Sequence, residues 1–390
     1  MRIEETEDQA LLREAIRTFV EHEAPVEKVD AWEAESVYPA ELFAALAEQG
    51  YLALPFDESV GGSGYGAVEM AIIAEELAKP GLDVAGGYGL TVFAGLNIVR
   101  HGAAELVERH IPAMLQGKER YALGITEPDA GSDVAGIKTR AKRTEAGYAI
   151  TGQKVFTTGA AIPGTLIHVL ARTGDAGRGH DGLSVFMVPN DAPGLELRRL
   201  DTVGRHMLGT YETFYDGVEV PESALIGEEG QGWEVVTSSL ELERVFAAAQ
   251  YAGAAHATLG LTAAYVNERE QFGRKIGSFQ SVAHRLADVL VKVESARLLA
   301  YRAATLVDSG GPANTDAAIA KLAASHAFQE AADAGMQFFG GYGYMTEYRI
   351  ERHWREARVT TITSGASEIQ RSIIAKDLLR GSRLRKAVAA

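Results

Sequence analysis

The sequence predicts a mainly α protein with a small β domain in its middle, because the spacing of apolar residues changes twice along the chain. In the first third, apolar residues recur at helical spacing, as at Met70, Ile73 and Leu77. Between about 121 and 228 the chain changes to short runs that are rich in β-branched residues and end in turn residues, as strands do. These runs are 148–158, 165–171, 183–189 and 211–220.

The last third predicts long helices that pack together. After Gly227 the chain becomes rich in alanine, and one face of a long helix is traced by Leu286, Val289, Leu290, Val293 and Ala296. A chain of 390 residues is long enough for two or three domains. We therefore expect a helical domain at residues 1–120, a central β domain at 121–228 and a C-terminal helical bundle at 229–390.

Composition excludes several classes of function. The 38 Lys and Arg against 53 Asp and Glu leave a net charge of −15, which repels phosphodiester backbones and anionic lipid surfaces. We therefore expect neither nucleic acid nor membrane as a partner. The sequence has no cysteine, which excludes disulfides, thiol nucleophiles and Cys-ligated metal clusters. Redox chemistry would have to come from a cofactor.

The remaining general signals are negative. The acidic start, MRIEETEDQA, lacks the basic and apolar regions of a signal peptide, and no stretch reaches the roughly 18 apolar residues of a membrane span. A cytoplasmic location is expected. The ten histidines show no pair at metal-binding spacing, so we expect no metal site. Gly62, Gly64 and Ala67 fit a dinucleotide pattern only loosely, because no strand precedes them, and the sequence has no GxSxG elbow and no P-loop.

A polar loop at the start of the β domain points to a cofactor. The segment LGITEPDAGSD, at 123–133, offers hydroxyls, a glycine and free amides, which suit a flavin and a pyrophosphate, although a plain turn has the same composition. Four other segments favour the cofactor: KVFTTGA at 154–160, REQFG at 269–273, QFFGGYGYMTEY at 337–348 and TSGASEIQR at 363–371. Together these segments closely resemble the acyl-CoA dehydrogenase family.

The resemblance covers nearly the whole chain and implies a fold, a cofactor and an assembly. The fold is a helical N-terminal domain, a β-barrel-like middle domain and a C-terminal four-helix bundle, usually assembled as a homotetramer. The cofactor is FAD, the substrate is an acyl-CoA, and the acceptor of the electrons is an electron-transferring flavoprotein. The implied reaction is the α,β-dehydrogenation of an acyl thioester.

The family's motifs assign cofactor and ligand contacts by position. Phe156 stands where the family often has Trp, and either ring can stack on the isoalloxazine. The other positions that match flavin contacts are Leu123, Ile125, Thr126, Ser132, Thr158, Ala366 and Glu368. Ser132 also matches a contact to the thioester ligand. Five more positions match family residues that contact the adenosine and pyrophosphate of an FAD bound mainly by a neighbouring subunit: Arg269, Phe272, Gln280, Gln337 and Gly341.

The resemblance also directs the search for the catalytic base. The family's reaction takes the α-proton while the β-hydrogen leaves as hydride to N5 of FAD, so a carboxylate is required. Many members carry it in a YEGT-like motif, where this chain has Ser364, whose backbone N–H would still polarise the thioester carbonyl. A subgroup that includes isovaleryl- and long-chain acyl-CoA dehydrogenases has a glutamate directly before an arginine on an earlier helix. The matching residues in LELER are Glu243 and Arg244.

Helical spacing agrees with Glu243 as the base. Glu243 shares a stripe with Val236, Leu240 and Ala247, whereas Glu241 points to another side. Desolvation on an apolar face raises the pKa of a glutamate above its reference of about 4.3, which suits a base, although an arbitrary helix glutamate is usually solvated. Further contacts to the substrate are assigned to Arg244, Gly365 and Lys376, although the helix dipole explains a lysine near a helix C-terminus equally well.

Three functions remain open at this stage. The first is a CoA-thioester dehydrogenase, and the second is a dehydrogenase of an acyl or aminoacyl group tethered to a carrier protein. The third is a flavin-dependent oxidase or monooxygenase, or a binding module without flavin, on the same fold. Pocket volume, which the sequence does not reveal, sets the chain length and branching of the substrate.

Overall fold

The computed structural model describes residues 5–174 and 179–380, and the chain forms two compact units. The helical unit contains Met1–Asp30, Gly66–Ala85 and Glu241–Ala390 within those limits, and the sheet unit contains Ala31–Tyr65 and Gly86–Leu240. The predicted mainly α protein with a sheet domain in the middle of the chain is confirmed. The helices α2 (Val26–Glu35), α5 (Leu82–His101) and α8 (Leu240–Glu268) begin in one unit and end in the other.

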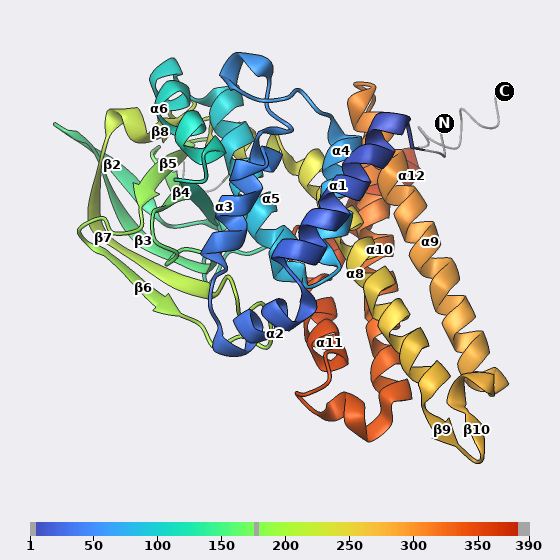
Figure 1. Ribbon diagram of the computed structural model, residues 1–390. Helices are drawn as coiled ribbons and strands as arrows, with labels where there is room; N and C mark the ends of the chain where they lie inside the picture. Colours follow the sequence, from blue (N-terminus) through green and yellow to red (C-terminus); the bar gives the residue numbers. More distant parts are fainter. Residues whose placement is uncertain (1–4, 175–178, 381–390) are drawn as a thin grey trace. The chain divides into compact units, whose positions relative to one another are not determined.

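The helical unit is built on long helices that run alongside one another (Figure 1). Besides α8, it contains α1 (Glu7–Glu23), α4 (Ala67–Ala78), α9 (Gln280–Asp308), α10 (Asn314–Phe339), α11 (Ile350–Val359) and α12 (Ser367–Arg380), with the hairpin β9 (Glu270–Gln271) and β10 (Arg274–Lys275) and the short helices η5 (Ile276–Ser278) and η6 (Gly340–Tyr344). The helix α9 packs against α4 and α10, and α10 packs against α11 and α12. Small residues permit this packing: a Cβ on Gly253 of α8 would stand 2.2 Å from the Glu75 carbonyl oxygen of α4.

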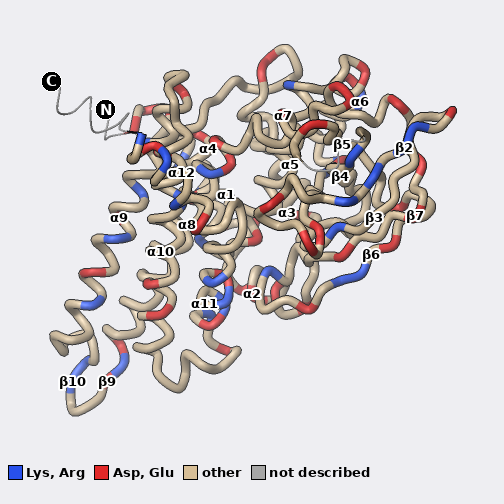
Figure 2. Tube along the Cα trace, turned by 180° about the vertical axis from the view of Figure 1, so that it is seen from behind, with Lys and Arg blue, Asp and Glu red and all other residues tan. Residues whose placement is uncertain are grey.

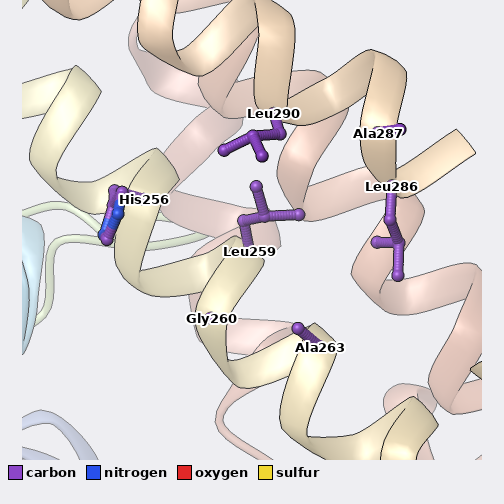
Figure 3. Close-up of a pocket in the computed structure, with 7 residues that line it drawn as sticks. All are labelled: His256, Leu259, Gly260, Ala263, Leu286, Ala287 and Leu290. Atoms are coloured by element: carbon purple, nitrogen blue, oxygen red, sulfur yellow. The ribbon is translucent and has the colours of Figure 1, made fainter. Parts of the chain in front are cut away.

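The predicted apolar face of α9 is only partly buried. Val289, Val293 and Ala296 lie in the core, whereas Leu290 is 44% exposed. Leu290 and Leu259 of α8 face one another across an open apolar pocket of about 330 Å³ (Figure 3).

The lysine and arginine side chains of α9 are paired along its length, and Figure 2 shows basic and acidic positions interspersed there. Arg285 bonds Asp333 of α10 at 2.7 Å, and Lys292 bonds Glu330.

The sheet unit holds an eight-stranded mixed sheet with the order β6-β7-β3-β2-β4-β5-β8, in which β1 pairs with β4. The strands are β1 (Arg120–Gly124), β2 (Arg140–Thr144), β3 (Gly147–Thr158), β4 (Thr165–Arg172), β5 (Leu183–Pro189), β6 (Leu195–Arg199), β7 (Thr210–Pro221) and β8 (Leu225–Ile226). The strands β3, β4, β5 and β7 confirm the four predicted runs. Alternating side chains such as Tyr148, Ile150, Val169 and Phe186 form the core.

The helical segments of the sheet unit are mostly short. They are α3 (Ala40–Glu48), η1 (Tyr51–Ala53), η2 (Glu58–Val60), α6 (Ala104–Leu115), η3 (Val134–Gly136), η4 (Glu222–Ala224) and α7 (Gly232–Thr237). The long helix α5 is the one helix in the described ranges that has the length and apolar character of a membrane span. Its most apolar window is 83% buried, and a core helix passes the same test.

A buried ionic cluster fastens α1, α4 and α9 together. Arg13 is 8% exposed, and its guanidinium lies 2.6 Å from Glu76 and 3.0 Å from Glu75. Glu75 also accepts hydrogen bonds from Arg297 and from Tyr301. A buried charge is tolerated when its partners surround it, and removal of one partner leaves the others uncompensated.

Arg13→Ala is therefore expected to lower the free energy of unfolding by about 3 kcal/mol, measured by urea denaturation. Lys292→Ala is the matched control, because Lys292 of α9 forms an ion pair with Glu330 of α10 in which both side chains are about half exposed. The control is expected to cost under about 1 kcal/mol. Equal losses in the two variants would contradict the structural role of the cluster.

Candidate functional site

Glu243 lies in the first turn of α8, among groups that act on its charge in opposite directions. Burial raises the pKa of the Glu243 carboxyl, while Arg244, a hydrogen bond from the Ser364 hydroxyl and the charge of Lys321 draw that pKa back down. The net shift is upward. The predicted stripe is interrupted, because Val236 belongs to α7 and α8 begins only at Leu240. Ala247, one turn further on, is buried as predicted.

Ser364 lies in the turn between α11 and α12, in a backbone conformation that is rare for serine. Its φ is 52°, and Gly365 follows at 79°. The N–H groups of Ser364, Gly365 and Ala366 have no hydrogen-bond partner within residues 5–174 and 179–380. Strained backbone with free donors is characteristic of functional sites. The structure thus brings Ser364 and Glu243 together, and it adds a side-chain contact that the sequence did not predict.

Lys321 is a member of this cluster that sequence reasoning missed. It lies on α10 with 0% exposure and donates hydrogen bonds to the carbonyl oxygens of Thr360 at 2.8 Å and Gly365 at 2.9 Å. Burial, followed by the neighbouring Arg244, lowers the pKa of Lys321 to about 8. The one signal in the sequence is a single charge inside the apolar run AAIAKLAA.

The residues assigned to substrate contact lie in different settings. Arg244 is buried and donates to the Asn314 side-chain oxygen at 2.6 Å. Gly365 belongs to the turn beside Ser364. Lys376 is exposed on α12, and Glu368 is exposed in the first turn of the same helix. The structure does not bring Lys376 into the cluster of Glu243, Ser364 and Lys321.

A second site in the helical unit is a cavity of about 620 Å³. Arg269 and Gly341 both line it, together with aromatic residues, and the Arg269 guanidinium lies 5.5 Å from the centre of the Tyr342 ring. An arginine over aromatic rings can hold an anionic or planar group. Gln280 and Gln337 are exposed and do not line the cavity, and Phe272 is 93% exposed on the β9–β10 hairpin at a φ of 54°.

The predicted flavin residues of the sheet unit lie around the end of β3. Ile125 and Thr126 follow β1, and the Val155 N–H donates to the Thr126 carbonyl at 2.9 Å. Next to it, Phe156 projects from a bulge between β3 and β7 at a φ of 59° and is 63% exposed. Leu123 and Thr158 are half-buried, and Ser132 is exposed in the loop that follows.

A buried ion pair holds this loop in place. Lys154 is 0% exposed and donates to Glu127 at 2.8 Å and to the Ile125 carbonyl at 3.1 Å. Glu127 also accepts from the backbone N–H groups of Lys138 and Thr139. Burial raises the pKa of Glu127, but Lys154 and these donors outweigh burial and lower it overall. In the part of the chain that the structure describes, no three acidic or histidine side chains are grouped to hold a metal ion.

Comparison with protein families decides what kind of protein carries these sites. The family models of the N-terminal, middle and C-terminal domains of acyl-CoA dehydrogenase match residues 6–118, 122–218 and 230–379 of this chain, respectively. The chain belongs to the acyl-CoA dehydrogenase family. It is therefore an oxidoreductase, and its cofactor is FAD.

Individual acyl-CoA dehydrogenases and their relatives match over almost their full length. A probable acyl-CoA dehydrogenase of Bacillus subtilis is 35% identical over 97% of this chain and 100% of its own. The caffeyl-CoA reductase-Etf complex subunit of Acetobacterium woodii is 32% identical over 96% of this chain and 99% of its own. Because both relatives align with nearly all of this chain, the similarity extends across all three domains of the family.

Two solved structures share the fold. Butyryl-CoA dehydrogenase from Megasphaera elsdenii has a TM-score of 0.91 at 32% identity, with 97% of this chain and 100% of that chain covered. The prolyl acyl carrier protein oxidase AnaB has a TM-score of 0.89 at 27% identity, with 96% and 100% covered. One fold therefore supports substrates on CoA and on a carrier protein, so the fold alone does not select between them.

Residues of this chain fit FAD on structural grounds. An exposed aromatic ring on strained backbone beside a polar loop suits a flavin, and an arginine in an aromatic cavity suits the adenosine and pyrophosphate end. The loop at Ile125 should therefore affect retention of the cofactor, because the buried Lys154 fixes its position.

Lys154→Met is expected to destabilise the fold by about 3 kcal/mol and to weaken FAD binding, because Glu127 loses its buried cation. Urea denaturation and flavin-fluorescence titration measure the two effects. Lys138→Ala is the control, because Lys138 pairs with Asp129 at 2.9 Å on the same loop with both side chains exposed. A double change, Lys154→Met with Glu127→Gln, is expected to recover stability; no recovery would contradict the ion-pair argument.

Proposed function

We propose that this enzyme oxidises the Cα–Cβ bond of an acyl-CoA thioester to the trans-2-enoyl thioester, and that Glu243 is the base that removes the α-proton. The observation that carries the proposal is that the side chain of Ser364 lies close enough to the Glu243 carboxyl to favour its ionised form. Position 364 is where many family members have their own glutamate. A carboxylate that reaches this position from α8 can remove the same α-proton, as in the isovaleryl-like subgroup.

Electrostatics supports this role. A base must be deprotonated to act, and its strength rises with its pKa. Burial raises the pKa of Glu243, while the cations around it keep the carboxylate form accessible. The free N–H of Ser364 can donate to the thioester carbonyl, which makes the α-proton more acidic.

The chain's own residues hold the cofactor, and FAD, when bound, supplies the acceptor for the β-hydride. We assign Phe156 to stacking on the flavin, with polar and backbone contacts from Leu123, Ile125, Thr126, Ser132, Thr158, Ala366 and Glu368. We assign Arg269 and Gly341, together with Phe272, Gln280 and Gln337, to the adenosine and pyrophosphate end of an FAD that is bound mainly by a neighbouring subunit. Substrate contacts fall to Ser132, Arg244, Gly365 and Lys376.

The proposed assembly is a homotetramer. Apolar side chains that no other described residue covers support contact between copies: Val291 and Leu298 of α9 are 66% and 52% exposed, and Phe272 is 93% exposed. The open pocket between α8 and α9 lies on the same helices (Figure 3). An electron-transferring flavoprotein is the proposed acceptor, supported by the Etf-complex relative. A cytoplasmic location stays a prediction.

A second candidate substrate is an acyl or aminoacyl thioester on a carrier protein. The likeness to the prolyl acyl carrier protein oxidase favours it. The chemistry at Glu243 would be the same, so only the group that carries the thioester differs. A flavin monooxygenase on this fold is less well supported, because it has no need of a carboxylate at position 243.

Glu243→Gln is expected to slow anaerobic flavin reduction by acyl-CoA about 10³-fold without loss of ligand binding, because the amide cannot accept a proton. Stopped-flow absorbance of the FAD-loaded protein measures the rate. In the wild type the rate should fall as the pH drops through the raised pKa of Glu243, since protonation removes the base. Glu241→Gln, two residues earlier on the same turn, is the control and should reduce at the wild-type rate. Equal rates in wild type and Glu243→Gln would remove Glu243 from the mechanism.

The carrier of the thioester can be tested with one acyl group in two forms. Flavin reduction by the free CoA ester is expected to be faster than reduction by the same acyl group on a carrier protein. Reduction by the carrier-bound ester alone would replace the first proposal with the second. A panel of acyl groups of increasing length and branching would then define the pocket.

A further inference from the structure

Lys321 is a buried cation that neither packing nor ion pairing explains. Its side chain has 0% exposure, and its helix neighbours Ala317, Ala318, Ala320 and Ala324 are all fully buried. No salt bridge reaches it from residues 5–174 or 179–380. An unpaired ammonium group in such surroundings is costly, so its charge needs a reason.

Hydrogen bonding alone does not supply that reason. The Thr360 carbonyl also accepts from the Ser325 hydroxyl at 3.1 Å, and the Gly365 carbonyl also accepts from the Gln370 amide at 2.9 Å. Each carbonyl would keep a donor without Lys321. What no neighbour on this turn replaces is the positive charge.

The charged groups around Lys321 come from three helices. The charges of Glu243 and Arg244 on α8 and of Glu368 on α12 act on Lys321, and His326 lies on the same helix as Lys321. The two carboxylates favour its protonated form, whereas Arg244 and burial oppose it. The same charge acts in return on Glu243, and it favours the ionised carboxylate.

We propose that Lys321 is a positioning residue for the base: it helps Ser325 and Gln370 to hold the turn that brings Ser364 against Glu243, and its charge keeps the Glu243 carboxylate ionised near neutral pH. This inference rests on the proposed role of Glu243 and deepens it. Lys321 touches neither the substrate nor the reacting proton, and it acts through Glu243 and through the turn.

Lys321→Met tests the proposal, because methionine keeps the length of the side chain and removes its charge. In anaerobic single-turnover reduction, the acid limb of the pH–rate profile is expected to move to higher pH. At a fixed pH on that limb the rate falls about tenfold for each unit of movement. Above pH 8, where the wild-type Lys321 loses its own proton, the two profiles should approach each other.

A purely structural role would affect other quantities. Ser325→Ala removes a hydrogen bond to the same Thr360 carbonyl and leaves the charge in place, so its acid limb should coincide with that of the wild type. Lys321→Gln keeps a hydrogen-bond donor without the charge and should shift the limb as Lys321→Met does. If Lys321→Met does not fold, Lys321→Gln still tests the proposal.

A readout that does not depend on turnover is the infrared titration of the Glu243 carboxyl band, identified by its absence in Glu243→Gln. Its midpoint should rise in Lys321→Met and stay at the wild-type value in Ser325→Ala. Coincident midpoints and acid limbs in Lys321→Met and wild type would overturn the inference. If acyl-CoA does not reduce the wild-type flavin, the proposed function fails instead, and the infrared titration still reports the effect of Lys321 on Glu243.

Discussion

Hydrogen bonds from Lys321, Ser325 and Gln370 to the Thr360 and Gly365 carbonyls together hold the turn on which the helical unit's site depends. The chain has only seven residues, 360–366, between α11 and α12, and Ser364 and Gly365 take positive φ to make that turn. Such a conformation persists only where its surroundings determine it. Three donors from α10 and α12 do so. Within the described part of the chain, the N–H of Ser364 has no hydrogen-bond partner.

Strain recurs where the other predicted ligand contacts lie. Phe156 and Phe272 both have positive φ, and their rings are 63% and 93% exposed. Each position combines an unfavourable backbone with an aromatic surface that packing within its own unit does not cover. A fold gains nothing from either feature alone, whereas a stacked cofactor or a second chain would cover the ring. The strain therefore supports ligand or partner contact at both places.

Periodicity in the sequence was enough to locate much of the fold. The strands β3, β4, β5 and β7 are rich in β-branched and apolar residues, with burial that alternates over parts of β3 and β7 and is nearly continuous in β4 and β5. The helices α4 and α9 carry clear apolar stripes. The strands β2 and β6 were not predicted because RAKRT and LELRR are dominated by charged residues, which resemble a loop. Family motifs located Glu243 and Phe156. Lys321 and Lys154 escaped notice because lysine is usually exposed, and only the fold brings their partners, up to 44 residues away, into contact.

The pairing of Glu243 with Ser364 explains why one carboxylate suffices. Because the Ser364 hydroxyl already reaches Glu243, a glutamate at 364 would place two carboxylates in contact, and like charges at that distance cannot both ionise. A serine avoids the repulsion and donates a hydrogen bond that favours the ionised partner. With Arg244 and Lys321 beside it, the carboxylate keeps a pKa raised by burial yet remains able to ionise. The position of the base can therefore move between two elements of one fold, provided that the other position carries a donor or no side chain.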